Sequence, residues 1–194
     1  MIKSKSEYLN YLKADQIALG RKEWCWKSSI IDDIWTFERL LRKLEYYTNC
    51  KQKTLISKII YYILVYKFHR MSIKLGFTVP VNVFGPGLSI GHVGTIVVNG
   101  SARIGANCRI HACTSIATAA GYSDKAPKIG NNVYIGPGAK IFGDIIIADD
   151  IAIGANSVVN SSFMEPGITI AGVPAKKVGN KGSKGLIIRG AETY

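Results

Sequence analysis

The chain has no long apolar segment of the kind that crosses a membrane or directs secretion. Its most apolar run is IIYYILVY, at residues 59–66, whereas a membrane-spanning helix needs about 20 such residues. The N-terminal residues MIKSKSEYLNYLKADQ alternate apolar and charged side chains and lack the apolar core and cleavage site of a signal peptide. We therefore expect a cytoplasmic protein.

Cysteine and histidine are also scarce. The four cysteines show no CxxC spacing and form no cluster with histidine, which argues against a structural zinc site. In a reducing compartment they are expected to be ordinary thiols. They are Cys25, Cys50, Cys108 and Cys113.

Acidic residues are few, with 13 Asp and Glu against 25 Lys and Arg, for a formal net charge of +12. This balance favours a polyanionic partner, whether nucleic acid, an acidic membrane surface or an anionic small molecule. The hydrophobic fraction of 47% excludes a disordered chain. A length of 194 residues suits one domain with a smaller appendage.

Residues 1–79 have a helical pattern and form the predicted N-terminal region. Residues 3–24 are expected to be helical, and a stronger pattern follows behind Asp32 and Asp33, which suit a helix N-terminus. Four apolar residues then recur at helical steps of three and four. They are Ile34, Phe37, Leu41 and Leu44.

A further helix is predicted from Thr54 to a stop at Gly76. We expect its apolar side to pack against other helices or another subunit. Because four basic residues flank that side, peripheral contact with a membrane is the alternative. The expected apolar side comprises Leu55, Ile56, Ile59, Ile60, Ile63 and Leu64, and the flanking cations are Lys58, Lys67, Arg70 and Lys74.

Residues 80–180 change to a six-residue period. Large aliphatic residues recur every sixth position, and several are followed directly by a glycine that suits a corner, such as Gly130, Gly136 and Gly154. A parallel β-helix explains this pattern, because each unit supplies one short strand and one bend. The two series are Ile104, Ile110 and Ile116, then Ile129, Ile135, Ile141, Ile147, Ile153 and Val159.

Three segments of this region carry a family resemblance. They are GHVGTIVVNGSARIG at 91–105, PKIGNNVYIGPGAKIFGD at 127–144 and ITIAGVPAKKVG at 168–179. They resemble the hexapeptide-repeat acyltransferases, and among them the serine acetyltransferase-like group. The resemblance implies a left-handed parallel β-helix, homotrimers or dimers of trimers with active sites between subunits, and acetyl-CoA as co-substrate without a metal.

His92 takes the place of the catalytic histidine in this resemblance. A histidine is well suited to remove a proton from an alcohol at neutral pH, and such a general base contributes about 10²- to 10⁴-fold. If the chain gains two residues near Val97, His111 lies one coil above His92 and faces the same cleft, where it touches substrate or has a structural role. Two histidines in the repeat region are too few for the three-imidazole metal site of the carbonic-anhydrase-like branch.

The six-residue rhythm is interrupted by ATAAGYSDKAP, at residues 117–127, which we expect to form a loop beside the substrates. Lys125 is a candidate for binding the acceptor. The cofactor candidates that the resemblance nominates are Thr118 in this loop, Pro137 and Ala155 on the coil edges, and Lys176 and Lys177 near the phosphates. Residues 181–194 are expected to be a solvated basic tail.

The chain departs from the serine acetyltransferase pattern where that pattern has charges for the amino acid. Phe77 and Gly91 replace acidic residues, and Lys125, Ala126 and Pro127 replace an Arg-His-Pro sequence. Leaving an ammonium group unpaired costs on the order of several kcal/mol.

These departures favour a sugar hydroxyl, on a precursor of a surface polysaccharide, as the acceptor. Serine O-acetylation in cysteine biosynthesis is the alternative. A basic trimeric scaffold that binds nucleic acid or membrane is the non-enzymatic alternative, although no stacking aromatics accompany the basic residues of the repeats and we expect no nucleic-acid partner.

Overall fold

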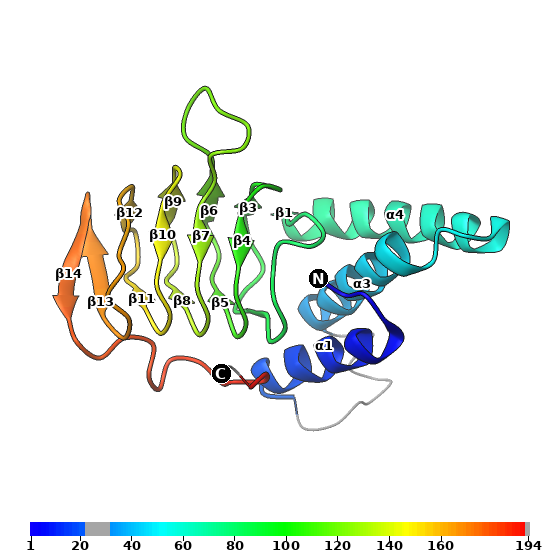
Figure 1. Ribbon diagram of the computed structural model, residues 1–194, viewed down its shortest axis with the longest axis horizontal. Coiled ribbons are helices and arrows are strands. Elements are labelled where there is room, and N and C mark those ends of the chain that lie inside the picture. Colours follow the sequence, from blue (N-terminus) through cyan, green and yellow to red (C-terminus); the bar gives the residue numbers. More distant parts are fainter. Residues whose placement is uncertain (22–31, 193–194) are drawn as a thin grey trace.

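The computed structural model describes residues 1–21 and 32–192, which form a helical part and a parallel β-helix (Figure 1). The helices are α1 (Lys5–Ala18), α3 (Asp33–Cys50) and α4 (Leu55–Leu75). Residues 22–24 of the first predicted helix, and Cys25, lie outside the described residues. No helix within the described ranges is long and apolar enough to cross a membrane.

The ends of the helices follow from local chemistry. The side chain of Asp32 accepts a hydrogen bond from the backbone N–H of Trp35, and Thr54 caps α4 in the same way. Gly76 ends α4 in the left-handed conformation, at φ 75°. The chain then enters β1 at Phe77, so the β-helix begins three residues before the predicted boundary at residue 80.

The β-helix consists of three sheets, each running along one side of the coil. The first has the order β1-β3-β6-β9-β12, the second β10-β7-β4 and the third β14-β13-β11-β8-β5-β2. All pairings between strands are parallel except that of β13 with β14.

All of the strands are short. The first sheet contains β1 (Phe77–Thr78), β3 (Ile96–Val98), β6 (Thr114–Ala117), β9 (Lys140–Phe142) and β12 (Val158–Val159). The second contains β4 (Arg103–Ile104), β7 (Lys128–Ile129) and β10 (Ile146–Ile147). The third contains β2 (Ser89–Ile90), β5 (Arg109–Ile110), β8 (Tyr134–Ile135), β11 (Ala152–Ile153), β13 (Thr169–Gly172) and β14 (Ala175–Gly179).

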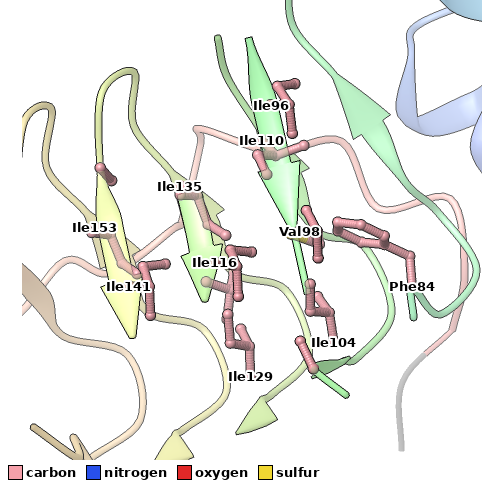
Figure 2. Packing of buried hydrophobic residues seen from close by; sticks show 14 of the residues in the cluster. Phe84, Ile96, Val98, Ile104, Ile110, Ile116, Ile129, Ile135, Ile141 and Ile153 are labelled. Atoms are coloured by element: carbon pink, nitrogen blue, oxygen red, sulfur yellow. The ribbon is translucent and has the colours of Figure 1, made fainter. Parts of the chain in front are cut away.

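The predicted aliphatic series forms the interior of the coil, as Figure 2 shows for most of its members. Every residue of the two series is buried, with at most 5% of its surface exposed. Ile135 pairs with Ile153 and Ile141 with Val159, each eighteen residues on. Three six-residue units therefore complete one coil, and the repeat predicted from the sequence is confirmed.

A buried ion cluster joins the helical part to the first coil. Arg42 is fully buried, and its Nε and Nη2 donate to the carboxylate of Asp15 at 2.7 and 3.2 Å. Its Nη1 donates to Glu45 and to the carbonyl oxygen of Phe84, both at 3.0 Å, and Nη2 also donates to that of Gly85 at 2.6 Å. The guanidinium thus connects α1, α3 and the β-helix.

Asp15 of this cluster and the buried Glu38 nearby hold the segment that leads to β2. Asp15 Oδ1 accepts from the backbone N–H groups of Gly87 and Leu88, each at 2.8 Å. Glu38 Oε1 accepts from that of Ile90 at 2.9 Å, while its Oε2 has no hydrogen-bond partner among the described residues. Burial, and then the charge of Asp15, raise the pKa of Glu38 well above its usual range.

Most of the apolar side of α4 is not packed against helices of the same protomer, and the C-terminal segment is not a solvated tail. Leu64 is buried, but Leu55, Ile56, Ile59 and Ile63 are exposed, so packing against another subunit and contact with a membrane stay predictions. The predicted solvated tail instead returns along the coils toward α1 (Figure 1), because its backbone finds partners there. Gly190 and Ala191, for example, donate to Asn107 Oδ1 at 3.0 and 2.8 Å.

The cysteines of the described ranges are free thiols. Cys108 points into the coil and is 1% exposed. Burial raises the pKa of its thiol to about 12, so Cys108 is a packing residue and not a nucleophile.

Candidate active site

His92 lies on a protruding bend that directly follows β2. Ile90 pairs with Ile110, twenty residues on, whereas Val98 pairs with Ile116, eighteen residues on. Two additional residues are therefore accommodated between Ile90 and Val98, in the bend that carries His92. The longer bend leaves the imidazole exposed at a corner of the coil.

His111 lies beside His92, on the next coil. The ring centroids are 5.7 Å apart, and the ring of Tyr134 on the following coil is 5.2 Å from that of His111. His111 is 9% exposed, and Arg109 Nε donates to its Nε2 at 3.4 Å. In the neutral ring the proton is therefore on Nδ1.

The surroundings of His111 favour this neutral form. Burial, the positive charge of Arg109 and the neighbouring His92 all lower the pKa of His111. Arg109 is itself held in place, since its Nη1 donates to Ser89 Oγ at 3.3 Å. His92 therefore has an uncharged imidazole ring beside it.

Gly91 makes room for the His111 ring. A Cβ atom at position 91 would lie 2.6 Å from His111 Nδ1 and 2.7 Å from Cε1, closer than carbon atoms pack. The glycine at position 91 and the imidazole at position 111 therefore depend on each other. The space that a side chain at position 91 would need is occupied by the His111 ring.

Phe77 cannot replace the missing carboxylate. It is 2% exposed and packs edge-on against Phe37, with ring centroids 5.0 Å apart. In the part of the chain that the structure describes, no hydrogen bond or ion pair joins His92 to a carboxylate.

Two of the cofactor candidates lie in one row with His92. The register of β2, β5, β8 and β11 places His92, Ala112, Pro137 and Ala155 at the same corner of successive coils. The backbone N–H of Gly138 donates to Ala112 O at 3.0 Å, which continues this register through the corner. Pro137 and Ala155 are exposed there, so the row is an open edge that begins at the imidazole.

Lys176 and Lys177 lie on β14, at the far end of this sheet. They pair with Ala171 and Ile170 of β13, which itself pairs with β11. Lys177 forms an ion pair with Glu165 at 2.7 Å, and both lysines are exposed. The row from His92 thus ends near two cations.

The interrupting segment leaves the coil between β6 and β7 as a projecting loop (Figure 1). Lys125 lies over the ring of Tyr122 within the loop, with Nζ 3.7 Å from the ring centroid. Thr118 is half-buried at the base of the loop. Between the described residues, no hydrogen bond or ion pair joins Lys125 to His92 or His111.

Two residues of the site, Arg109 and Tyr134, were not predicted. The signal for them is the register: once two residues are added between Ile90 and Val98, Gly91 falls opposite His111, and Arg109 and Tyr134 align on neighbouring coils. Throughout residues 1–21 and 32–192, no group of three or more His, Cys, Asp or Glu side chains is placed to hold a metal ion.

Comparisons with known proteins show which enzymes the chain resembles. No family model matches the chain. The serine acetyltransferase of Helicobacter pylori strain J99 is 38% identical over 95 residues, which cover 48% of this chain and 55% of that enzyme. The Neisseria gonorrhoeae serine acetyltransferase, solved in complex with serine, superimposes with a TM-score of 0.69 at 30% identity, over 90% of this chain and 70% of that one.

The chain belongs to the serine acetyltransferase-like group of hexapeptide-repeat acyltransferases. A second member of this group, the Brucella abortus serine acetyltransferase solved with coenzyme A, has a TM-score of 0.68 at 25% identity, over 91% of this chain and 68% of that one. The chain spans about half the length of the Helicobacter relative, since the match covers 55% of that enzyme. Membership of the group accounts for the six-residue repeat of the chain.

Proposed function

We propose that the protein is an acetyl-CoA-dependent O-acetyltransferase in which His92 is the general base. The observation that carries this proposal is the exposed imidazole beside the neutral His111 ring, at the start of an open edge. His92 takes the proton of the acceptor hydroxyl while the hydroxyl oxygen attacks the thioester carbonyl of acetyl-CoA. The tetrahedral intermediate then expels CoA as a thiolate, which receives the proton from the His92 imidazolium.

Acetyl-CoA is proposed to lie along the row that His92 begins. The pantetheine arm would follow the corner at Pro137 and Ala155, with Thr118 at the loop base, and the phosphates would approach Lys176 and Lys177. The coenzyme A complex of the Brucella relative supports this co-substrate. A left-handed coil, assembly as a trimer with clefts between protomers, and a cytoplasmic location belong to the same proposal.

Serine is the acceptor that the comparisons favour. The Helicobacter relative is a serine acetyltransferase, and the Neisseria enzyme was solved with serine. In this reading Lys125 of the loop binds the carboxylate of the amino acid. The comparisons give no support to the sugar of a surface polysaccharide that the sequence departures suggested.

One structural observation keeps an uncharged acceptor as a second candidate. The His111 ring fills the space at Gly91, and no carboxylate among the described residues forms a hydrogen bond or ion pair with His92. A neutral imidazole ring suits the hydroxyl of a sugar better than it suits the ammonium group of an amino acid.

The test is the release of free CoA from acetyl-CoA with L-serine and with nucleotide sugars as separate acceptors. We expect release with L-serine, reduced about 10²- to 10⁴-fold by His92→Ala. If CoA is released with a nucleotide sugar but not with L-serine, the acceptor is the sugar hydroxyl and not serine. Release that His92→Ala leaves unchanged would contradict the role of His92 as general base. No release with any acceptor would contradict the enzymatic proposal and favour the basic scaffold.

A further inference from the structure

Helix α4 has two apolar faces, and only one of them is packed. Successive residues of an α-helix are about 100° apart around its axis. On that spacing Leu64 and Leu75, which are buried, lie on the side that meets α3 and β1. The opposite side carries large apolar side chains in solvent: Leu55 (76% exposed), Ile59 (53%), Tyr62 (69%), Ile63 (49%), Tyr66 (66%) and Ile73 (61%).

These six residues, the outward face of α4, form one continuous stripe about 100° wide by the same spacing. The helix extends beyond the end of the β-helix, away from the coils (Figure 1). Contiguous exposed apolar surface of this kind marks an interaction site in a folded protein.

Charge decides what covers the outward face. Residues 51–76 contain six Lys and Arg and no Asp or Glu. Lys74 forms an ion pair with Asp33 at 2.7 Å. Lys58, Lys67 and Arg70 form no ion pair with any described residue, and they lie within or beside the outward face.

A second copy of this helix would bring three further uncompensated cations against these three, in a chain whose net charge is already +12. Like charges at a contact oppose association. An anionic surface would instead compensate them.

We propose that the outward face of α4 binds the surface of an anionic membrane. The helix lies in the plane of the bilayer, with its isoleucines and leucine in the boundary between headgroups and acyl chains. Tyr62 and Tyr66 suit the level of the headgroups, where amphipathic rings gather. Lys58, Lys67 and Arg70 extend from their apolar stems to the lipid phosphates.

The test is co-sedimentation of the full chain with vesicles. We expect binding to vesicles of equimolar phosphatidylcholine and phosphatidylglycerol, little binding to phosphatidylcholine alone, and release by high salt. The variant Lys58→Glu/Arg70→Glu is expected to weaken binding at least tenfold. The matched control is Lys5→Glu/Lys13→Glu on α1, which changes the net charge equally at two positions away from α4 and should bind as the parent does.

A second variant tests the apolar stripe separately. Tyr62→Ser/Tyr66→Ser removes two exposed rings and should leave thermal unfolding unchanged while reducing vesicle binding. The proposal is overturned if the parent does not bind the anionic vesicles, or if both charge variants lose binding equally. It is also overturned if the Tyr62→Ser/Tyr66→Ser variant dissociates an assembly in analytical ultracentrifugation while vesicle binding is absent, since a second copy then covers the face.

Discussion

Gly91→Ala tests the arrangement that joins position 91 to His111. The added Cβ would lie 2.6 Å from His111 Nδ1, so the ring must retreat by roughly 0.8 Å to reach the shortest ordinary contact of 3.4 Å. Tyr134 and Arg109 border the ring on its other sides, so the retreat is opposed. Overpacking of this kind costs about 1–3 kcal/mol.

The cost should be visible in two measurements. Urea denaturation should show the loss in the free energy of unfolding, and kcat/KM for acetyl transfer should fall because the shifted ring no longer lies as it did beside His92. In a double-mutant cycle, His111→Ala removes the obstructing ring, so Gly91→Ala should cost little in that background. The coupling free energy should therefore account for most of the roughly 1–3 kcal/mol.

Gly100→Ala is the matched control. Gly91 and Gly100 both have backbones outside the left-handed region, so alanine is allowed at each, and a Cβ at position 100 would meet only Pro80 at 3.8 Å. If Gly91→Ala changes neither quantity more than Gly100→Ala does, or if its cost is the same with and without the His111 ring, the proposed arrangement is wrong.

Three further predictions follow from the buried cluster and the cationic end of the row. Arg42→Met leaves the Asp15 carboxylate buried without its cation and should cost about 3–5 kcal/mol in the free energy of unfolding; a loss below about 1 kcal/mol in urea denaturation would contradict this reading of the cluster. The raised pKa of Glu38 means that the folded state keeps a proton that the unfolded chain loses near pH ~4.3. The free energy of unfolding should therefore fall as pH rises from there to the folded pKa, and Glu38→Gln, which retains an acceptor for Ile90, should flatten this dependence in a series of denaturation curves; an unchanged slope would refute it. Lys176→Ala/Lys177→Ala should raise KM for acetyl-CoA with little change in kcat, and an unaltered KM would remove these lysines from the proposed cofactor site.

The sequence predicts the repeating coils better than it predicts the surroundings of His92 at the corner of the first coil. The series from Ile129 to Val159 repeats without interruption, so periodicity alone predicts the strands, the interior and the bends. Caps such as Asp32 and Gly76 act within four residues, which makes helix ends readable as well. The neighbours of His92 depend instead on the bend that holds the two additional residues. The sequence places this gain near Val97 only as a condition, and the pairing of the strands puts it between Ile90 and Val98.

Long-range polar contacts are also invisible to periodicity. Asp15 and Arg42 are separated by 27 positions and look like ordinary surface charges of two helices. The sequence likewise predicts that α4 is a helix with many apolar residues, yet a helix that is apolar almost all round does not show which side will be packed.

The returning C-terminal segment has a consequence for how the molecule unfolds. A solenoid whose coils contact only their neighbours can lose its last coil without disturbing the first. Here Arg189 is paired with Asp150 at 2.6 Å, Ala191 is bonded to Asn107, and Gly190 lies against the carbonyl of Ala14 in α1. Detaching this segment would therefore loosen three regions together, so the two ends of the solenoid are coupled and fraying of the last coil is not independent of the N-terminal helices.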